Sequence, residues 1–215
     1  MTRNRFFRLL AVLLGLGIWY GSQFLLGDRI YNPGGVTGSE ILTYNDGLLE
    51  LFKPVNTFLN NCPSCANALL IVSSGIIDIL GITILLQTIF GTSFRPFIGL
   101  LILFSLRQIV QFLCELPPPL GMVFHYPGFP SLLVTYSVTN GFFFSGHTAM
   151  AVFGATQIIR LNCRGMIPLA VLIVLFEMIT LLVLRAHYTM DIFTGAVTAL
   201  WVAQIIESRR PKFLK

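Results

Sequence analysis

Residues 166–206 read MIPLAVLIVLFEMITLLVLRAHYTMDIFTGAVTALWVAQII. Two apolar runs, Met166–Leu184 and Met190–Ile206, flank a short polar segment that contains Arg185 and His187. A helix needs about 17–25 residues to cross the hydrocarbon core of a bilayer, so both runs are long enough to span a membrane. The stretch therefore predicts two transmembrane helices that hold ionisable side chains between them at one membrane face.

The composition of the whole chain is that of a membrane protein. Of its 215 residues, 55% are hydrophobic and 11% are charged, and the mean hydropathy is +0.80. Soluble domains carry roughly 25% charged residues. The net charge of +5 does not indicate a nucleic-acid partner, because the basic residues flank apolar runs and form no patch. Walker loops, dinucleotide-binding glycine motifs and zinc-finger spacings are absent from the sequence.

Apolar stretches of this kind recur along the chain. The sequence therefore predicts an all-α, polytopic membrane protein in which six transmembrane helices form a single integral membrane domain over residues 1–215. The first stretch has the basic start of a secretory signal peptide but no clear small-Xaa-small cleavage site, which favours a retained helix. The stretches are Leu9–Leu26, Ala66–Phe90, Phe97–Leu116, Phe143–Ile159, Met166–Leu184 and Met190–Ile206.

The basic residues indicate how these helices are oriented. Most of the 14 Lys and Arg residues fall in the termini and in the loops of one side. The positive-inside rule assigns that side to the cytoplasm, so both termini are predicted to be cytoplasmic. The basic residues on this side are Arg3, Arg5, Arg8, Arg95, Arg160, Arg164, Arg209, Arg210, Lys212 and Lys215.

Two short polar motifs reach the opposite, non-cytoplasmic face in this topology. Ser145-Gly146-His147-Thr148 lies at the outer end of the fourth stretch, and His187-Tyr188-Thr189-Met190-Asp191 lies between the fifth and the sixth. The chain has only 3 histidines. The placement of two of them on one face predicts that they belong to a single site.

The residue types in these motifs suit chemistry on a phosphoester. Asp191 follows His187 at a spacing that puts both on one helix face, so the carboxylate can orient the ring. His187 is then the candidate nucleophile, and His147 is the candidate general acid and base. Ser145 favours a helix N-cap, and Gly146 opens the helix N-terminus to an anion. Two histidines and an aspartate also suit zinc, but no third imidazole or thiolate falls at the site.

Phe144-Ser145-Gly146-His147-Thr148, followed by His187-Tyr188-Thr189-Met190-Asp191, resembles the lipid phosphatase/phosphotransferase (PAP2-like) superfamily. Within it, the closer similarity is to the sphingomyelin synthase branch, which includes phosphatidylcholine:diacylglycerol cholinephosphotransferases. Arg107 and the string Leu116-Pro117-Pro118-Pro119 resemble the segment that precedes the second outer loop in that branch.

The resemblance implies a fold, a site and a reaction. It implies six membrane helices, a core catalytic region at about residues 97–207, and the catalytic triad His147, His187 and Asp191. The implied enzyme transfers a phospho-head group, most readily phosphocholine, between lipid alcohols such as diacylglycerols through a phosphohistidine. A phosphatidate or lipid phosphate phosphatase on the same scaffold, and a sphingomyelin synthase-like transfer to ceramide, remain alternatives.

Departures from the family patterns bear on these alternatives. The phosphatase branch has a Lys-(six residues)-Arg-Pro motif, but here Thr88 stands in the lysine position before Arg95-Pro96. Leu181 stands where that branch has an arginine. Both differences argue against an ordinary phosphatidate phosphatase. Gly141 stands where the synthase branch often has an acidic residue, which leaves the choice of acceptor open.

Charged residues inside or beside apolar runs are candidates for substrate binding. Arg185 lies close to His187, where its guanidinium can grip phosphate oxygens or extend to the interface. Arg107, Asp78 and Glu177 fall inside apolar runs, where charge is costly. We expect Arg107 to pair with Glu177, with Asp78 or with both, or to contact phosphate.

Aromatic residues and the motif residues complete the candidate binding set. Tyr188 and Tyr136 can offer a cation–π surface to choline, and Ser145 and Gly146 lie where phosphate would bind. The loop at about residues 117–141 begins with three prolines and is too apolar for a solvated loop, so it is predicted to roof a cavity.

The other outer loop gives two further expectations. Ile41–Phe58 can form a short amphipathic interfacial helix. Cys62 and Cys65 can form a disulfide in an oxidising compartment or remain free thiols.

The predicted partners are phospholipid and diacylglycerol-type substrates and the bilayer itself, without nucleic acid, cofactor or metal. The predicted location is an endoplasmic reticulum or Golgi-type membrane or a bacterial inner membrane. In either case the active site is expected on the non-cytoplasmic side. The sequence does not indicate an oligomeric state.

Overall fold

The computed structural model describes residues 3–27, 46–114, 116–136, 143–161 and 163–208. The described residues form helices and irregular segments without strands, which confirms the all-α class. Their helices are α1 (Arg3–Gly27), α2 (Gly47–Leu51), α3 (Lys53–Asn61), α4 (Pro63–Phe90), α5 (Arg95–Leu113), α6 (Gly146–Ile159), α7 (Met166–Val183) and α8 (Thr189–Ser208).

Of the described helices, 5 are long and apolar enough to cross a membrane, namely α1, α4, α5, α7 and α8. The exception among the expected spans is α6, which has 14 residues and falls short of the about 17 that a span needs. Helix α6 starts at Gly146 because Ser145 is its N-cap. The apolar pattern predicts a start at Phe143, but the described residues directly before Ser145 are not helical. The expectation of six spans is therefore not confirmed, since the described residues form five helices of spanning length and the shorter α6.

Proline and capping side chains set several helix boundaries. Pro63 and Pro96 lie in the first turns of α4 and α5, where a missing backbone N–H costs no intrahelical hydrogen bond. The predicted end of the third stretch near Leu116 lies close to the observed end of α5 at Leu113, upstream of the prolines.

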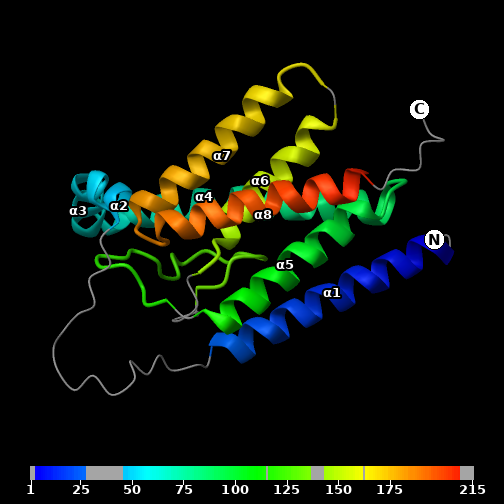
Figure 1. Cartoon of the computed structure of the whole chain (residues 1–215), viewed down its shortest axis with the longest axis horizontal. Helices are drawn as coiled ribbons and strands as arrows, with labels where there is room; N and C mark the ends of the chain where they lie inside the picture. The colour runs from blue at the N-terminus through cyan, green and yellow to red at the C-terminus, as the bar shows by residue number, and fades with distance from the viewer. Residues whose placement is uncertain (1–2, 28–45, 115, 137–142, 162, 209–215) are drawn as a thin grey trace.

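The short helix α6 lies at the centre of the bundle, in contact with α4, α5, α7 and α8 (Figure 1). Helix α1 lies at the edge, beside α5 and α4. The start of α1 and the end of α8 lie on the same side of the molecule. The α7–α8 corner lies toward the other side, where the start of α6 lies against the start of α8.

The outer segments are tied to the α7–α8 corner by polar contacts. The Asn56 side chain in α3 donates to the carbonyls of Gly121 and Val183, both at 3.0 Å. Asp46 caps α2, and its carboxylate also accepts from the backbone N–H of Thr189 at 2.7 Å. The amphipathic helix expected within Ile41–Phe58 is thus present as α2 and α3, although residues 41–45 lie outside the described part of the chain.

The expected ion pairing of Arg107 with Glu177 or Asp78 is wrong. Glu177 accepts a hydrogen bond from Ser73 at 2.7 Å. Asp78 accepts from the backbone N–H groups of Leu132 and Leu133, both at 2.9 Å, and so anchors the proline-led loop to α4. Counting residues along a helix gives the depth of a charge but not the direction in which it points, and these carboxylates face other partners.

The sequence left open whether Cys62 and Cys65 are bonded. In the structure they form a disulfide at the start of α4. The disulfide joins Cys62, which directly follows α3, to Cys65 in the first turn of α4 and so links the two helices.

Candidate functional site

The N-terminus of α6 is fixed by its capping residue. The Ser145 hydroxyl accepts from the backbone N–H of Thr148 at 3.3 Å and from its hydroxyl at 3.0 Å. The Ser145 N–H in turn donates to the carbonyl of Asp191 at 3.1 Å. The N-cap predicted from the sequence is confirmed. Because Ser145 is fully buried and engaged in capping, it locks the start of α6 onto the start of α8.

Two glycines allow this close packing. A Cβ atom at Gly195 in α8 would lie 2.7 Å from the carbonyl oxygen of Ser145. A Cβ atom at Gly146 would lie 2.9 Å from Nε and 3.3 Å from Cζ of Arg107. The guanidinium of Arg107 therefore lies directly against the first turn of α6, in space that a larger residue at position 146 would fill.

Arg107 is left with a buried donor that the described residues do not satisfy. Its Nε atom is buried and has no hydrogen-bond partner within the described ranges. A buried donor without a partner costs free energy, and a cation beside a helix N-terminus favours a bound anion. Arg107 and the first turn of α6 together make a suitable anion-binding surface.

The chain enters the second histidine motif through a tight turn. At the end of α7, the N–H of Ala186 donates to the carbonyl of Leu181 at 2.9 Å, and the N–H of Arg185 donates to that of Leu182 at 3.1 Å. This pattern is a Schellman motif, in which Arg185 takes the left-handed position usually held by glycine, with φ at 50°. The turn brings His187 back over the end of the bundle.

His187 and Asp191 come together as the sequence predicts. His187 Nδ1 lies 3.5 Å from Asp191 Oδ2, which also accepts from the backbone N–H of Tyr188 at 2.9 Å. His187 precedes the first residue of α8, so the pair forms across the helix entrance and not on a helix face. The Asp191 carboxylate therefore holds the His187 ring through its Nδ1 side.

The Asp191 carboxylate has no access to solvent. Asp191 is fully buried, and its Oδ1 atom has no hydrogen-bond partner among the described residues. The separation of 3.5 Å between His187 Nδ1 and Asp191 Oδ2 is long for a direct hydrogen bond. A positive charge that develops on His187 would shorten this contact.

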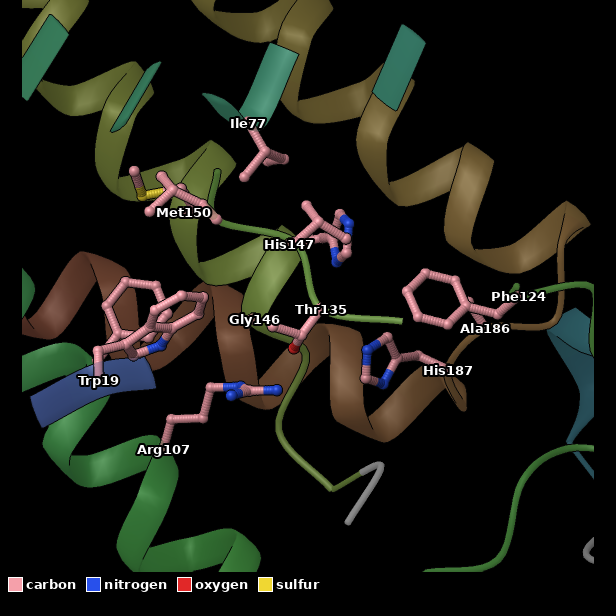
Figure 2. Close-up of a pocket in the computed structure, with 13 residues that line it drawn as sticks. Trp19, Ile77, Arg107, Phe124, Thr135, Gly146, His147, Met150, Ala186 and His187 are labelled. Atoms are coloured by element: carbon pink, nitrogen blue, oxygen red, sulfur yellow. The ribbon is translucent and has the colours of Figure 1, made fainter. Parts of the chain in front are cut away.

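Both histidines line one small cavity of about 70 Å³. Figure 2 shows the rings of His147 and His187 and the guanidinium of Arg107 around this space, next to Gly146. Phe124 contributes an apolar wall, and its ring meets that of His147 edge-on at 5.9 Å between centroids. The loop that follows the three prolines lines the cavity through Phe124 and residues 133–135. The sequence predicts that this loop roofs a cavity, and these contacts agree with that prediction.

Four of the predicted binding residues do not line this cavity, namely Ser145, Arg185, Tyr188 and Tyr136. The Arg185 guanidinium donates to the carbonyls of Leu120 and Leu49, both at 2.9 Å, and contacts the Glu50 carboxylate at 3.1 Å. The Tyr136 hydroxyl meets that of Ser74, and its ring packs on Phe124 at 4.9 Å between centroids. Of these contacts, the one between Tyr136 and Phe124 reaches a residue that lines the cavity.

Asp46 is a positioning residue that sequence reasoning missed. Its carboxylate accepts from Leu48 and Leu49 and also from the N–H and hydroxyl of Thr189, at 2.7 and 2.6 Å. Partial burial raises the pKa of this carboxyl, but the hydrogen bonds outweigh burial and leave the pKa below its usual value. An aspartate directly before Gly-Leu-Leu-Glu is an N-cap signal, although its second partner at Thr189 leaves no local signal.

The backbone is strained beside both histidine motifs. Phe144 directly precedes the Ser145 cap and has φ at 77°, and Arg185 has φ at 50°. Residues with a side chain rarely adopt this region, and strain of this kind clusters at functional sites. Phe144 is held there by nearly complete burial in the core.

Comparisons with known proteins point to one family. A family model described as AtPDCT1/2 matches residues 46–208, which include both histidine motifs and all the described helices except α1. Neither a curated protein nor a solved structure matches the chain. The matched family is related to phosphatidylcholine:diacylglycerol cholinephosphotransferases. Since the match covers more than half of the chain, this protein belongs to the AtPDCT1/2 family, whose character is that of a lipid-modifying transferase.

Proposed function

We propose that this protein transfers phosphocholine from one diacylglycerol-type lipid to the hydroxyl of another through a phosphohistidine on His187. The observation that carries the proposal is the shared cavity. His187, oriented by Asp191, faces the same space as His147 and the cation Arg107. The family match supports the class of lipid substrate.

The first half of the reaction loads the histidine. The lone pair on His187 Nε2 attacks the phosphorus of phosphatidylcholine, and the bond from phosphorus to the glycerol oxygen breaks. Protonated His147 gives its proton to the departing alkoxide, which leaves as diacylglycerol. Asp191 stabilises the charge that develops on the His187 ring. Arg107 and the N-terminus of α6 hold the non-bridging phosphate oxygens.

The second half of the reaction reverses these roles. The hydroxyl of the acceptor lipid attacks the phosphorus, His147 takes the hydroxyl proton, and the bond between phosphorus and Nε2 breaks. Both histidines return to their starting states, so no cofactor is consumed. The apolar lining of the cavity, including Phe124, limits water, which favours a lipid hydroxyl over hydrolysis.

The predicted binding residues take different parts in this proposal. Arg107 contacts phosphate, and Gly146 gives its guanidinium room. Arg185 and Ser145 hold the α7–α8 corner and the start of α6 in place. Tyr136 and Tyr188 lie around the cavity, where they complete the aromatic surroundings of the choline group. The single membrane domain has the core catalytic region proposed at about residues 97–207, both termini in the cytoplasm and this site on the non-cytoplasmic side of the membrane.

The test uses purified protein and phosphatidylcholine labelled in its head group, with and without unlabelled diacylglycerol. Label appears in new phosphatidylcholine only when diacylglycerol is present. Release of free phosphocholine without an acceptor identifies water as the acceptor and a hydrolase, and preference for ceramide identifies a sphingomyelin synthase-like enzyme. His187→Ala abolishes transfer. His125→Ala is the control and retains transfer, because His125 does not line the cavity and its Nε2 atom lies 2.8 Å from Oδ1 of Asn67.

A further inference from the structure

A second, larger cavity adjoins the catalytic one. It has a volume of about 310 Å³ and lies between α1, α4 and α5. Trp19, Phe104, Leu133 and Met150 line both cavities. The cavity around His147 and His187 and this groove therefore share walls. The proposed head-group transfer gives the groove no role.

The groove opens to the apolar outer surface of the bundle. Ile18, Leu101 and Ile109 line it, and their exposed fractions are 64%, 42% and 56%. Because α1, α4 and α5 are candidate membrane spans, the outer surface at these residues faces lipid in the membrane. A hydrocarbon chain can therefore enter the groove sideways and does not have to cross water.

Polar atoms without hydrogen-bond partners among the described residues belong to side chains that line the groove. Trp19 Nε1 and both polar atoms of the Gln108 side chain are buried and lack hydrogen-bond partners in the part of the chain that the structure describes. Gln108 lines the groove, and its neighbour Arg107 lines the catalytic cavity. Donors of this kind need an acceptor when water is excluded. In a diacyl glycerolipid, the ester carbonyls lie between the phosphate and the hydrocarbon chains.

Glycine keeps part of the groove open. Gly15 in α1 lines it, and a Cβ atom there would lie 2.8 Å from Cζ of Phe97, another lining residue. Gly17 lies on the same helix but does not line the groove, and a Cβ atom there would meet nothing within 4 Å. These two positions give a matched pair for testing what the groove holds.

We propose that the groove between α1 and α5 holds an acyl chain of the glycerolipid whose phosphate lies between His147 and His187, and that Trp19 and Gln108 donate to its ester carbonyls. This inference rests on the proposed function and adds where the substrate chain lies and which part of the lipid is recognised. It also gives α1, which lies outside the residues matched by the family model, a place in the substrate site.

The first experiment measures transfer from long-chain and short-chain phosphatidylcholine. In Gly15→Leu, KM for the long-chain donor rises at least about tenfold, because the leucine overfills the groove, while turnover of the short-chain donor stays within about twofold. Gly17→Leu matches the unmodified protein. Ser105→Phe, which fills the groove from α5, gives the same result in a second background, with the exposed Ile98→Phe as its control. Equal slowing of both donors in both groove variants overturns the proposal.

The second experiment addresses the ester contacts. The unmodified protein prefers diacyl over dialkyl ether phosphatidylcholine, and Gln108→Leu reduces this preference about tenfold because it removes a donor to the carbonyl. An unchanged preference overturns the carbonyl assignment.

A photo-crosslinking readout does not depend on turnover. Phosphatidylcholine with a diazirine on its acyl chain labels peptides of α1 and α5 in the unmodified protein, and Gly15→Leu loses this labelling. If the protein moves no head group but is labelled there, the proposed function fails and the groove assignment stands. If head-group transfer occurs and labelling falls elsewhere, the groove assignment alone fails.

Discussion

Replacing Gly146 by alanine tests whether the guanidinium of Arg107 is held at the start of α6. The added Cβ atom would lie 2.9 Å from Arg107 Nε, whereas ordinary Cβ contacts begin at 3.4 Å, so the guanidinium must retreat by about 0.5 Å. Misplacement of a catalytic group by about 1 Å costs on the order of 100-fold in rate. We therefore expect kcat for head-group transfer to fall about tenfold in Gly146→Ala.

Thermal unfolding separates this effect from damage to the fold. Alanine is favoured over glycine in a helix by about 0.5–1 kcal/mol, so the Tm of Gly146→Ala in detergent should not fall. Gly75→Ala is the matched control, because a Cβ atom at this position in α4 would meet nothing within 4 Å. Unchanged kcat in Gly146→Ala would refute the placement of Arg107 as a phosphate ligand, and a drop of equal size in Gly75→Ala would show that the effect is not local.

Three further changes test other parts of the site. Asp191→Asn lowers kcat by about 10²–10⁴-fold, because an amide no longer holds His187 in the required tautomer; near-normal kcat would remove Asp191 from the mechanism. Arg107→Lys lowers transfer at least about tenfold while Tm is kept, because a lysine cannot make bidentate contact with phosphate; a parallel fall in Tm would indicate a structural role. Asp46→Asn lowers stability by about 1 kcal/mol near neutral pH through weakened contacts to Thr189. Since folding depresses the pKa of Asp46, this difference is full above about pH 5 and disappears as pH falls below about 4; a difference that persists in Tm measurements at low pH would contradict the assignment.

The parts of the fold that were predictable depend on local patterns. The lengths of the apolar runs predicted all 5 of the described helices that are long enough to span a membrane. The prolines and Ser145 predicted helix boundaries close to those observed. The two histidine motifs meet because the helices that carry them are packed neighbours, α6 beside α7 and α8. The apolar pattern overestimates the length of α6, because a buried central helix can be as apolar as a spanning helix and yet be shorter.

The contacts that sequence reasoning missed join residues far apart in the chain. Arg185 donates to Leu120 and Leu49, which are 65 and 136 positions away. No sequence feature near Arg185 marks these carbonyls as its acceptors. Its closeness to His187 in the sequence therefore favours the interpretation that Arg185 binds phosphate. The same holds for Asp46 and Thr189, which are 143 positions apart. The direction in which Arg107 points likewise depends on how α5 packs against the first turn of α6.

Transfer through His187 requires a covalent phosphohistidine intermediate, which can be trapped. The protein is incubated with phosphatidylcholine labelled on phosphorus, without acceptor, then quenched in base and digested. We expect an acid-labile, base-stable phosphocholine adduct on the peptide that contains His187. The adduct is absent in His187→Ala and disappears when diacylglycerol is added before the quench. Transfer that proceeds without such an adduct, or an adduct on His147 in its place, would show that His187 is not the nucleophile.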